Sequence, residues 1–381
     1  MGALFILGRV VAVDCEKKSL RYRSNSNLTA GDANDSETLS FDYLSINVGS
    51  VTMPMREPKS LPQGTTPLHP SDSIIYTRPV SQLVSHISKF ASNWYSAAAA
   101  TTDGTIATQH ELPTSLSCLS SPRIVVVGGG SAGVELVAAL RRRFPSSELS
   151  LLASSETIGI LHRDNVSEKV KKALRQRQVS IYTQTVALGQ CQLVNGFPAI
   201  HGRQARSAAY QEEKRQKKQK NNITKEGEGG KGDNGENATV DIYLPFDLCV
   251  MATGAAAPPL LQAISGLTWA SHGFIQVDGT MQAAPGVFAA GDCAEVLDYH
   301  LPKAGVYAVR EAPIVAENIM RIAEGQEKEK LLEYQPQRDF MALLNLCDGV
   351  GIGTWKSLAF SGGWVWWLKN RIDSGFMQRF Q

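Results

Sequence analysis

The stretch Ile124–Glu135 reads Ile-Val-Val-Val-Gly-Gly-Gly-Ser-Ala-Gly-Val-Glu and decides the fold of this 381-residue chain. A β-branched run ends at Gly128, and glycines recur at Gly130 and Gly133. Between a strand and a helix, Gly128 permits a tight turn, Gly130 leaves room for a pyrophosphate and Gly133 lets helix and strand pack closely. The sequence therefore predicts dinucleotide binding, with the phosphates at the helix N-terminus. The alternative is a tight turn with a purely structural role.

The strand that closes such a fold occurs twice. Phe41–Gly49 and Phe246–Gly254 share the Phe-Asp start, the apolar run and the spacing to glycine. An internal repeat of this kind predicts two nucleotide-binding folds. The predicted fold class is α/β, with two Rossmann-like, three-layer domains of the FAD- or NAD(P)-binding type, the first of them incomplete, and a small C-terminal α+β segment.

Composition excludes several classes of protein. The content is 43% hydrophobic and 19% charged, as in soluble proteins, and a net charge of +2 gives no electrostatic case for a nucleic-acid partner. No run of about 18 apolar residues predicts a transmembrane helix, and the first residues lack the basic start of a secretory signal. We expect an intracellular protein, cytoplasmic or in an organelle.

The cysteines are scattered and form no Cys-x-x-Cys motif or metal-ligand spacing. They are Cys15, Cys118, Cys191, Cys249, Cys293 and Cys347. This pattern predicts a reducing compartment, thiols that mostly pack, no metal site and no local redox disulfide.

A second candidate site lies near residue 292. Gly291 and Asp292 end a buried apolar strand and precede a helix, so the carboxylate is predicted at the ligand-binding end of a sheet. Together with Thr253 and Gly254, which end one closing strand, this pattern favours a contact to the ribityl chain of a flavin. The alternative is a helix N-cap, a role that aspartate fills well.

The type of nicotinamide nucleotide stays open at the sequence level. The acidic residue that would hold a ribose 2′-hydroxyl is absent from its usual place, because Leu152 is followed by Ala153, Ser154 and Ser155, with Glu156 only beyond. Serines can hydrogen-bond either a hydroxyl or a 2′-phosphate. Both NADH and NADPH are therefore compatible with this loop.

Taken together, these motifs resemble the pyridine nucleotide-disulfide oxidoreductase superfamily. The resemblance is strongest to type II NADH dehydrogenase-like flavoproteins and to the oxidoreductase domain associated with selenide, water dikinase. Its most specific parts are Lys-Ala-Gly-Val-Tyr-Ala-Val-Arg-Glu-Ala-Pro over Lys303–Pro313 and the tail Trp-Leu-Lys-Asn-Arg-Ile-Asp-Ser-Gly-Phe-Met over Trp367–Met377.

The resemblance implies a flavoenzyme with FAD in one fold and NADH or NADPH in the other. Hydride would pass from the nicotinamide to the flavin and on to a small-molecule acceptor such as a quinone. Asp292 would hold the ribityl chain, and Glu135 would lie beside the nicotinamide as the candidate catalytic residue. The implied cofactor-binding residues are Gly49, Gly128, Gly130, Ser131, Gly133, Ser154, Thr253, Gly254, Gly291, Asp292, Ala304, Gly305 and Val306.

The beginning of the chain departs from this family pattern. Relatives open with a strand, a glycine turn and a helix for the FAD pyrophosphate, whereas a strand meander precedes Phe41 here. We therefore expect the N-terminal FAD-binding βαβ unit to be missing. The rival interpretation is a non-catalytic NAD(P)-binding regulatory or interaction module that has lost FAD.

The predicted domains are discontinuous. Residues 1–121 and 255–330 are predicted to form a truncated FAD-binding domain, and residues 122–254 an NAD(P)H-binding domain with a disordered insertion over 204–239. Residues 331–381 form a C-terminal segment. Its aromatic and basic part, 364–381, predicts peripheral membrane contact, or alternatively packing on the flavin domain or across a homodimer.

Overall fold

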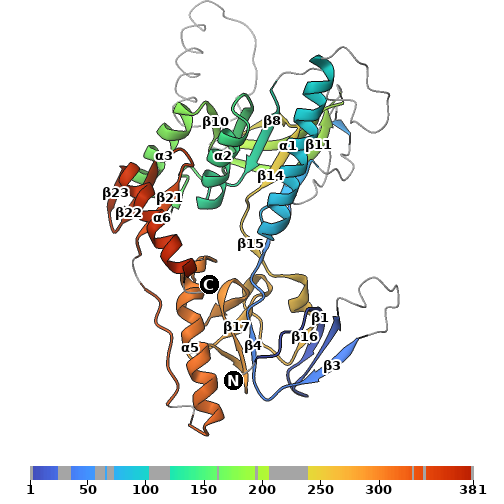
Figure 1. Cartoon of the computed structure of the whole chain (residues 1–381), viewed down its shortest axis with the longest axis vertical. Coiled ribbons are helices and arrows are strands. Elements are labelled where there is room, and N and C mark those ends of the chain that lie inside the picture. Colours follow the sequence, from blue (N-terminus) through green and yellow to red (C-terminus); the bar gives the residue numbers. More distant parts are fainter. Residues whose placement is uncertain are drawn as a thin grey trace, which may run out of the picture. The chain divides into compact units, whose positions relative to one another are not determined.

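The computed structural model describes residues 3–24, 36–55, 65–66, 73–102, 121–160, 163–193, 196–205, 239–327, 330–337 and 340–378. The chain divides into two compact units (Figure 1). Unit 1 comprises Met1–Met53 and Gly254–Arg338, and unit 2 comprises Pro54–Thr253 and Asp339–Gln381. Apart from its ends in two strands, the predicted insertion 204–239 lies outside the described residues.

Unit 2 is built on a five-stranded parallel sheet. In spatial order its strands are β10 (Val179–Tyr182), β9 (Glu148–Leu152), β8 (Arg123–Val127), β14 (Leu248–Met251) and β7 (Ile74–Tyr76). Within its described residues this unit has the helices α1 (Val80–Thr102), α2 (Ser131–Arg143), α3 (Asp164–Gln176) and α6 (Gly363–Met377). The glycine-rich turn joins β8 to α2, and β14, the core of the second closing strand, pairs with β8 in parallel.

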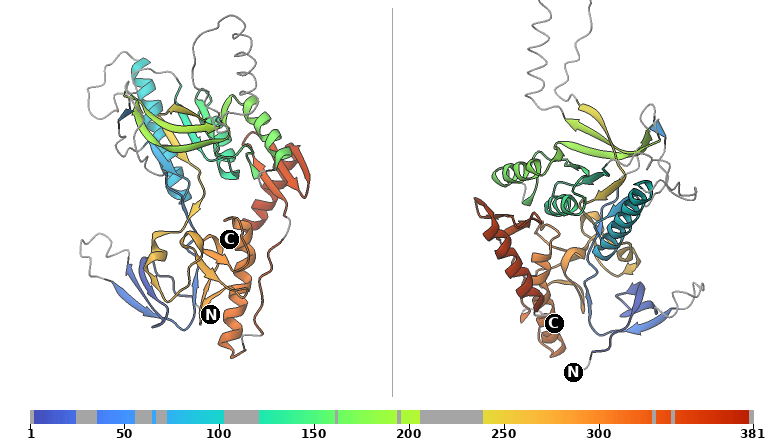
Figure 2. Two further views of the ribbon diagram at one scale, coloured as in Figure 1. Left: turned by 180° about the vertical axis from the view of Figure 1, so that it is seen from behind. Right: turned by 45° about the horizontal axis from the view of Figure 1, so that its top comes forward.

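Successive side chains of β8 point to opposite faces of this sheet. Ile124 and Val126 belong to a buried cluster that includes residues of α1, α2 and α3, whereas Val125 and Val127 pack on the opposite side with Ile200. That side is covered by an antiparallel sheet (Figure 2). Its strands are β6 (Thr65–Thr66), β11 (Thr185–Leu193), β12 (Pro198–Ala205) and β13 (Thr239–Pro245). Unit 2 therefore has the predicted three layers.

The C-terminal segment adds a three-stranded antiparallel sheet and α6 to unit 2. Its strands are β21 (Ala342–Asn345), β22 (Gly351–Trp355) and β23 (Leu358–Gly362). Leu344 and Ile352 join the core cluster of α2 and α3, and Arg142 of α2 donates to the Cys347 carbonyl at 2.6 Å. This segment is thus part of the nucleotide-fold core.

Unit 1 is a set of small sheets with one long helix, α5 (Gly305–Ala323). The largest sheet orders β16 (Ile264–Ser265), β1 (Gly8–Asp14), β2 (Ser19–Ser24) and β3 (Glu37–Ser40). A second orders β18 (Gln282–Ala284), β19 (Val287–Ala289) and β4 (Leu44–Ile46). The remaining pairs are β15 (Ala255–Ala256) with β5 (Val51–Thr52) and β17 (Ile275–Val277) with β20 (Ala294–Val296). Short 3₁₀ turns are η3 (Pro259–Ala263), η4 (Ser271–Gly273) and η5 (Gly291–Cys293).

The two predicted closing strands lie in different units. β4, within Phe41–Gly49, pairs in parallel with β19, and β14 pairs in parallel with β8. Compactness divides the chain differently from the predicted domains, because β7 pairs with β14 and so joins the segment before residue 121 to unit 2. The division into compact units does not test which cofactor binds to each unit, so that assignment stays a prediction.

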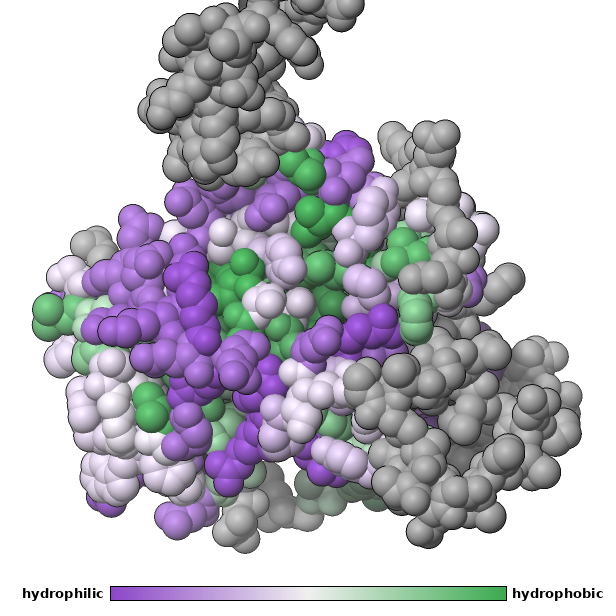
Figure 3. Space-filling model, turned by 90° about the horizontal axis from the view of Figure 1, so that it is seen from above, coloured by the Kyte–Doolittle hydropathy of each residue, from purple (hydrophilic) through white to green (hydrophobic). Residues whose placement is uncertain are grey.

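The surface mixes hydrophobic and hydrophilic residues, as the view from above illustrates (Figure 3). Among the larger apolar side chains, α6 exposes Trp364, Trp367, Ile372 and Met377. Trp364 also stacks on Phe360 of β23, with ring centroids 5.0 Å apart. Within the ranges that the structure describes, no helix is long and apolar enough to cross a membrane.

The Phe-Asp start of the second closing strand has a structural role that predicts a stability effect. Asp247 accepts the Arg123 backbone N–H at 2.8 Å and binds its guanidinium at 3.1 and 2.8 Å. The Asp247 side chain is only 6% exposed. Asp247→Ala should therefore lower the free energy of unfolding by about 3 kcal/mol, because it strands a partly buried guanidinium.

Chemical denaturation measures this loss. Glu168→Ala removes a carboxylate that is 68% exposed and pairs with Lys171 on α3, and it should cost less than about 1 kcal/mol. Equal losses in the two variants would contradict the role given to Asp247.

Candidate functional site

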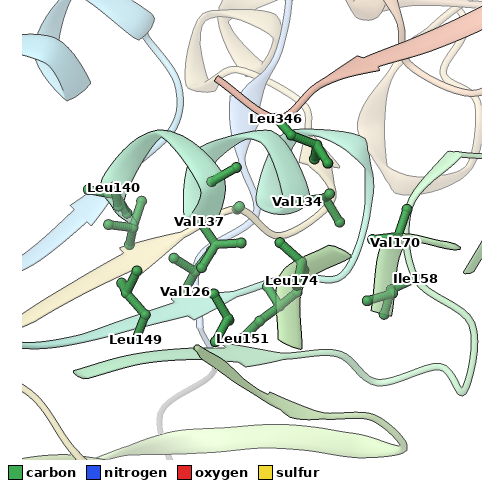
Figure 4. Packing of buried hydrophobic residues seen from close by; sticks show 14 of the residues in the cluster. Val126, Val134, Val137, Leu140, Leu149, Leu151, Ile158, Val170, Leu174 and Leu346 are labelled. Carbon is green, nitrogen blue, oxygen red and sulfur yellow. The ribbon is translucent and has the colours of Figure 1, made fainter. Parts of the chain in front are cut away.

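The glycine-rich loop of unit 2 holds three chain segments in close contact. Gly128 has φ +130°, and a Cβ there would overlap the Ala252 carbonyl oxygen of the chain leaving β14. A Cβ at Gly133 would overlap the Gly128 carbonyl oxygen. Both positions therefore require glycine, as the sequence predicts. The close approach seats α2 on the sheet, where Val126, Val134 and Val137 belong to one buried cluster (Figure 4).

Gly130 differs from its neighbours because it faces open space. An added Cβ would meet no protein atom within 4 Å, although Gly130 is the N-cap of α2 and carries no side-chain cap. Ser131, the first residue of the helix, is exposed. Backbone N–H groups and the positive end of the helix dipole therefore converge on a space that a side chain would fill. This geometry fits the pyrophosphate of a dinucleotide.

Three further predicted residues follow strands of unit 2: Ser154, and the pair Thr253 and Gly254 that the sequence assigns to a flavin contact. Ser154 is exposed in the loop after β9. Thr253 and Gly254 follow β14, with Thr253 in unit 2 and Gly254 in unit 1. Gly254 is anchored within unit 1, because its backbone carbonyl accepts the Met53 N–H at 2.8 Å. The structure thus gathers Gly128, Gly130, Gly133 and Ser131 at one turn.

The predicted site of unit 1 centres on Asp292 in η5. Gly291 has φ +74° and turns the chain two residues after the end of β19. Asp292 accepts the Ser50 hydroxyl at 2.8 Å, next to Gly49, which has φ +68° and no atom within 4 Å of an added Cβ. The ends of β19 and of the first closing strand are therefore brought together, and Ser50 is a contributor that the sequence reasoning missed.

The start of α5 completes the setting of unit 1. Ala304 is an extended N-cap without a side-chain cap, and an added Cβ on Gly305 would meet no atom within 4 Å. A pocket of about 10 Å³, room for about one water molecule, is lined by residues that include Asp292, Lys303 and Tyr307. The N-terminus of α5 can therefore favour a group that carries negative charge, such as the pyrimidine side of a reduced flavin. These polar groups and the uncapped helix start suit the ribityl chain and pyrimidine side of a flavin, and their role as a flavin site stays a prediction.

Lys303 and Glu311 are two further charged groups at this pocket. Lys303 Nζ donates to the Ala294 carbonyl at 2.6 Å and lies 4.2 Å from the Phe274 ring centroid, and burial lowers its pKa. Glu311 is 4% exposed and accepts the Gly291 N–H at 2.6 Å. Burial raises the pKa of Glu311 above its ordinary value, despite the Gly291 hydrogen bond and the Lys303 charge, which lower it.

Glu311 therefore fixes the turn that presents Asp292. Glu311 lies within the Lys303–Pro313 run, but the sequence assigns it no role, because its partner Gly291 is 20 residues away in the chain.

Glu135 lies in a cluster of unit 2 side chains. Its carboxylate accepts the Asn345 backbone N–H at 2.7 Å, and Lys369 Nζ lies 3.8 Å from the same oxygen. Burial raises the pKa of Glu135, while Asn345 and Lys369 lower it. These contacts anchor the C-terminal segment to α2. The catalytic role of Glu135 beside a nicotinamide stays a prediction.

The described thiols are buried or half-buried and free. Burial raises the pKa of Cys191, Cys249, Cys293 and Cys347, and raises the pKa of Cys15 to about 11. Cys118 lies outside the described residues. The five described thiols are therefore poor nucleophiles at neutral pH.

Comparison with known proteins agrees with the architecture. The family model described as pyridine nucleotide-disulphide oxidoreductase matches residues 2–312. No curated protein sequence matches the chain significantly. The predicted α/β fold class with Rossmann-like folds is confirmed.

Solved structures share this fold at low sequence identity. A FAD-dependent pyridine nucleotide-disulphide oxidoreductase from Desulfovibrio vulgaris is 16% identical, with a TM-score of 0.53 over 91% of this chain and 66% of that one. The NAD-dependent persulfide reductase from A. fulgidus is 16% identical, with a TM-score of 0.56 over 91% and 48%. NDH2 from Plasmodium falciparum in complex with NADH is 13% identical, with a TM-score of 0.62 over 93% and 76%. The chain thus spans less than two thirds of the length of the first two.

Because Gly130 borders open space, a substitution there should affect NADH binding without affecting the stability of the fold. Gly130→Ala should leave the melting temperature unchanged, since the new methyl meets no protein atom, yet weaken NADH binding by about tenfold or more by occupying the phosphate space. Isothermal titration calorimetry and a thermal melt measure the two effects. Gly133→Ala is the contrast, because its methyl would overlap Gly128 and should destabilise the fold itself. Unchanged NADH binding in a folded Gly130→Ala variant would contradict the assignment.

The raised pKa of Glu311 predicts a pH dependence of stability. The pKa of the Glu311 carboxyl is higher in the folded protein than in the unfolded chain. Its contribution to the free energy of unfolding is therefore largest below the unfolded-state pKa, and it is lost as the pH rises through the folded-state pKa. Glu311→Gln does not titrate and keeps an oxygen that can accept the Gly291 N–H. Relative to the wild type, its free energy of unfolding should therefore increase from acidic to neutral pH.

Denaturation series across that pH range measure the difference. Glu317→Gln, at a more exposed glutamate of the same helix, is the matched control for the substitution itself. A constant difference between the wild type and Glu311→Gln would show that the carboxyl does not titrate as the structure indicates.

Proposed function

Because the chain belongs to the pyridine nucleotide-disulphide oxidoreductase family, we propose that it is a flavin-dependent NAD(P)H oxidoreductase. When bound, NAD(P)H supplies a hydride and FAD the ring that accepts it. The observation that carries the proposal is the presence of one suitable site in each unit. These are the open helix N-terminus at Gly130 and the turn at Asp292 before the uncapped start of α5.

Unit 2 is proposed to hold the nicotinamide nucleotide. The N–H groups at Gly130 and Ser131 would bind the pyrophosphate, and Gly128 and Gly133 keep side chains out of the way. These contacts fix the position of the nucleotide without acid or base chemistry. Positioning of this kind is what a direct hydride transfer requires from the protein.

Unit 1 is proposed to hold FAD through polar groups at its strand ends. Asp292, oriented by Ser50 and by the Gly291 turn, would accept hydrogen bonds from the ribityl hydroxyls. The backbone N–H groups of Ala304, Gly305 and Val306, at the start of α5, would favour negative charge on the flavin. The Lys303–Pro313 run also supports a place near the oxidoreductase domain associated with selenide, water dikinase.

The electrons are proposed to leave to an external small-molecule acceptor, for which a quinone is one candidate. The support comes from the described thiols, because burial keeps all five protonated and therefore poorly suited to form an internal redox disulfide. Among the structural neighbours, NDH2 from Plasmodium falciparum was solved with NADH.

The proposal predicts that Asp292 is needed for flavin binding. Purified chain titrated with FAD should quench flavin fluorescence, and Asp292→Ala should weaken FAD affinity by about tenfold or more, since it removes a charged hydrogen-bond acceptor. Asp298→Ala, at an exposed position after β20, is the matched control and should bind FAD as the wild type does.

Two outcomes would count against the proposal. Absence of FAD binding by the folded wild type would favour a non-catalytic NAD(P)-binding module instead. Equal FAD affinity in Asp292→Ala would remove Asp292 from the flavin site.

A further inference from the structure

The loop after β9 is the part of unit 2 where a nucleotide-binding fold distinguishes NADH from NADPH. In such folds the adenosine ribose lies at the carboxyl end of the second strand, and the 2′ position meets the residues that follow. Here that strand is β9, and the residues that follow are Ala153, Ser154, Ser155 and Glu156. The inference drawn from this loop rests on the proposed nicotinamide site at Gly130.

The first residues of the loop are fixed by the sheet. The Ala153 N–H donates to the Tyr182 carbonyl at 2.8 Å, and its own carbonyl accepts the Thr185 N–H at 2.9 Å. Ala153 is 1% exposed and has only a methyl group to offer. The usual position of the ribose-binding acid is thus filled by a buried alanine.

The polar groups of the loop lie beyond Ala153. The Ser155 hydroxyl is used internally, because it donates to the Thr157 carbonyl at 2.5 Å. Ser154 is exposed, and so is Glu156. These two side chains are the ones in the loop that can turn to a ligand.

Glu156 is held at the rim of the parallel sheet. Its carboxylate accepts from Gln184 Nε2 at 3.3 Å, and the Gln184 N–H donates to the Ser155 carbonyl at 3.1 Å. Gln184 lies two residues after the end of β10. The amide therefore keeps the carboxylate beside the carboxyl ends of β9 and β10, where the ribose of a bound dinucleotide would lie.

Basic side chains are lacking in the two segments that form this rim. The sequence has no lysine or arginine from Leu149 to Ile160 or from Val179 to Ile200. In neighbouring segments, Arg203 Nε bonds Asp241 at 2.9 Å, and Arg163 lines a surface depression with Lys356. A cation is the strongest partner for a 2′-phosphate, and the sequence of these two rim segments supplies none.

We infer that unit 2 selects NADH over NADPH, with Glu156 as the specificity residue. The two free ribose hydroxyls of NADH can hydrogen-bond Ser154 and the Glu156 carboxylate. A 2′-phosphate would instead bring two negative charges against that carboxylate. Glu156 thus takes the role of the missing acid from a position three residues further along the loop.

Equilibrium titration of the full chain tests this inference. NADH and NADPH are followed by reduced-nicotinamide fluorescence, and AMP and adenosine 2′,5′-bisphosphate serve as probes of the adenosine end alone. We expect NADH to bind at least about tenfold more tightly than NADPH, and AMP to be preferred over the bisphosphate. Added salt should bring the affinities of NADH and NADPH closer together, and likewise those of AMP and the bisphosphate, because it screens the repulsion between the 2′-phosphate and Glu156.

Variants locate the effect. Glu156→Gln should narrow the NADH preference by about threefold or more, and Glu156→Arg should reverse it by supplying a cation. Glu148→Gln, an exposed acid at the opposite end of β9, should leave the ratio unchanged.

The outcomes are distinguishable. NADPH binding as tight as NADH binding, or an unchanged ratio in Glu156→Gln, overturns the specificity inference but leaves the nicotinamide site intact. Binding of neither nucleotide to a chain that melts cooperatively overturns the proposed function itself, and the inference with it.

Discussion

The close approach of three backbone segments at Gly128 and Gly133 is the constraint on which the rest of unit 2 depends. Gly133 of α2 rests against the Gly128 carbonyl, and Gly128 rests against the carbonyl of Ala252. Any side chain at either glycine would push the helix from the sheet. The contact places the α2 N-terminus beside the ends of β8 and β14, and Gly130 is the glycine of the motif at which an added Cβ would find open space. Packing and ligand binding are thus divided between neighbouring residues.

Much of this arrangement could be predicted from local sequence. The motif Ile124–Glu135 predicted a strand, a turn and a helix, and β8 and α2 occupy those places. The repeat of Phe-Asp predicted two closing strands, which the structure places in separate sheets. These features are readable because each depends on residues adjacent in the chain.

The rest depends on contacts between distant residues, which one sequence does not reveal. Glu311 binds the Gly291 N–H across 20 residues, and the Asn345 N–H reaches Glu135 across 210 residues. Glu135 was predicted from its motif to lie beside a nicotinamide. Its observed partners in β21 and α6 are contacts that no local pattern could indicate. The Glu156–Gln184 pair at the rim of the sheet, 28 residues apart, is of the same kind.

With FAD proposed in unit 1 and the nicotinamide nucleotide in unit 2, the proposed function requires hydride to pass from NADH to the flavin. Anaerobic stopped-flow mixing of the FAD-loaded chain with NADH deuterated at the nicotinamide C4 measures this step. The flavin absorbance should bleach, deuterium should slow the bleaching, and one NADH should be consumed per flavin. An FAD-loaded chain that binds NADH without any bleaching would contradict the proposed function.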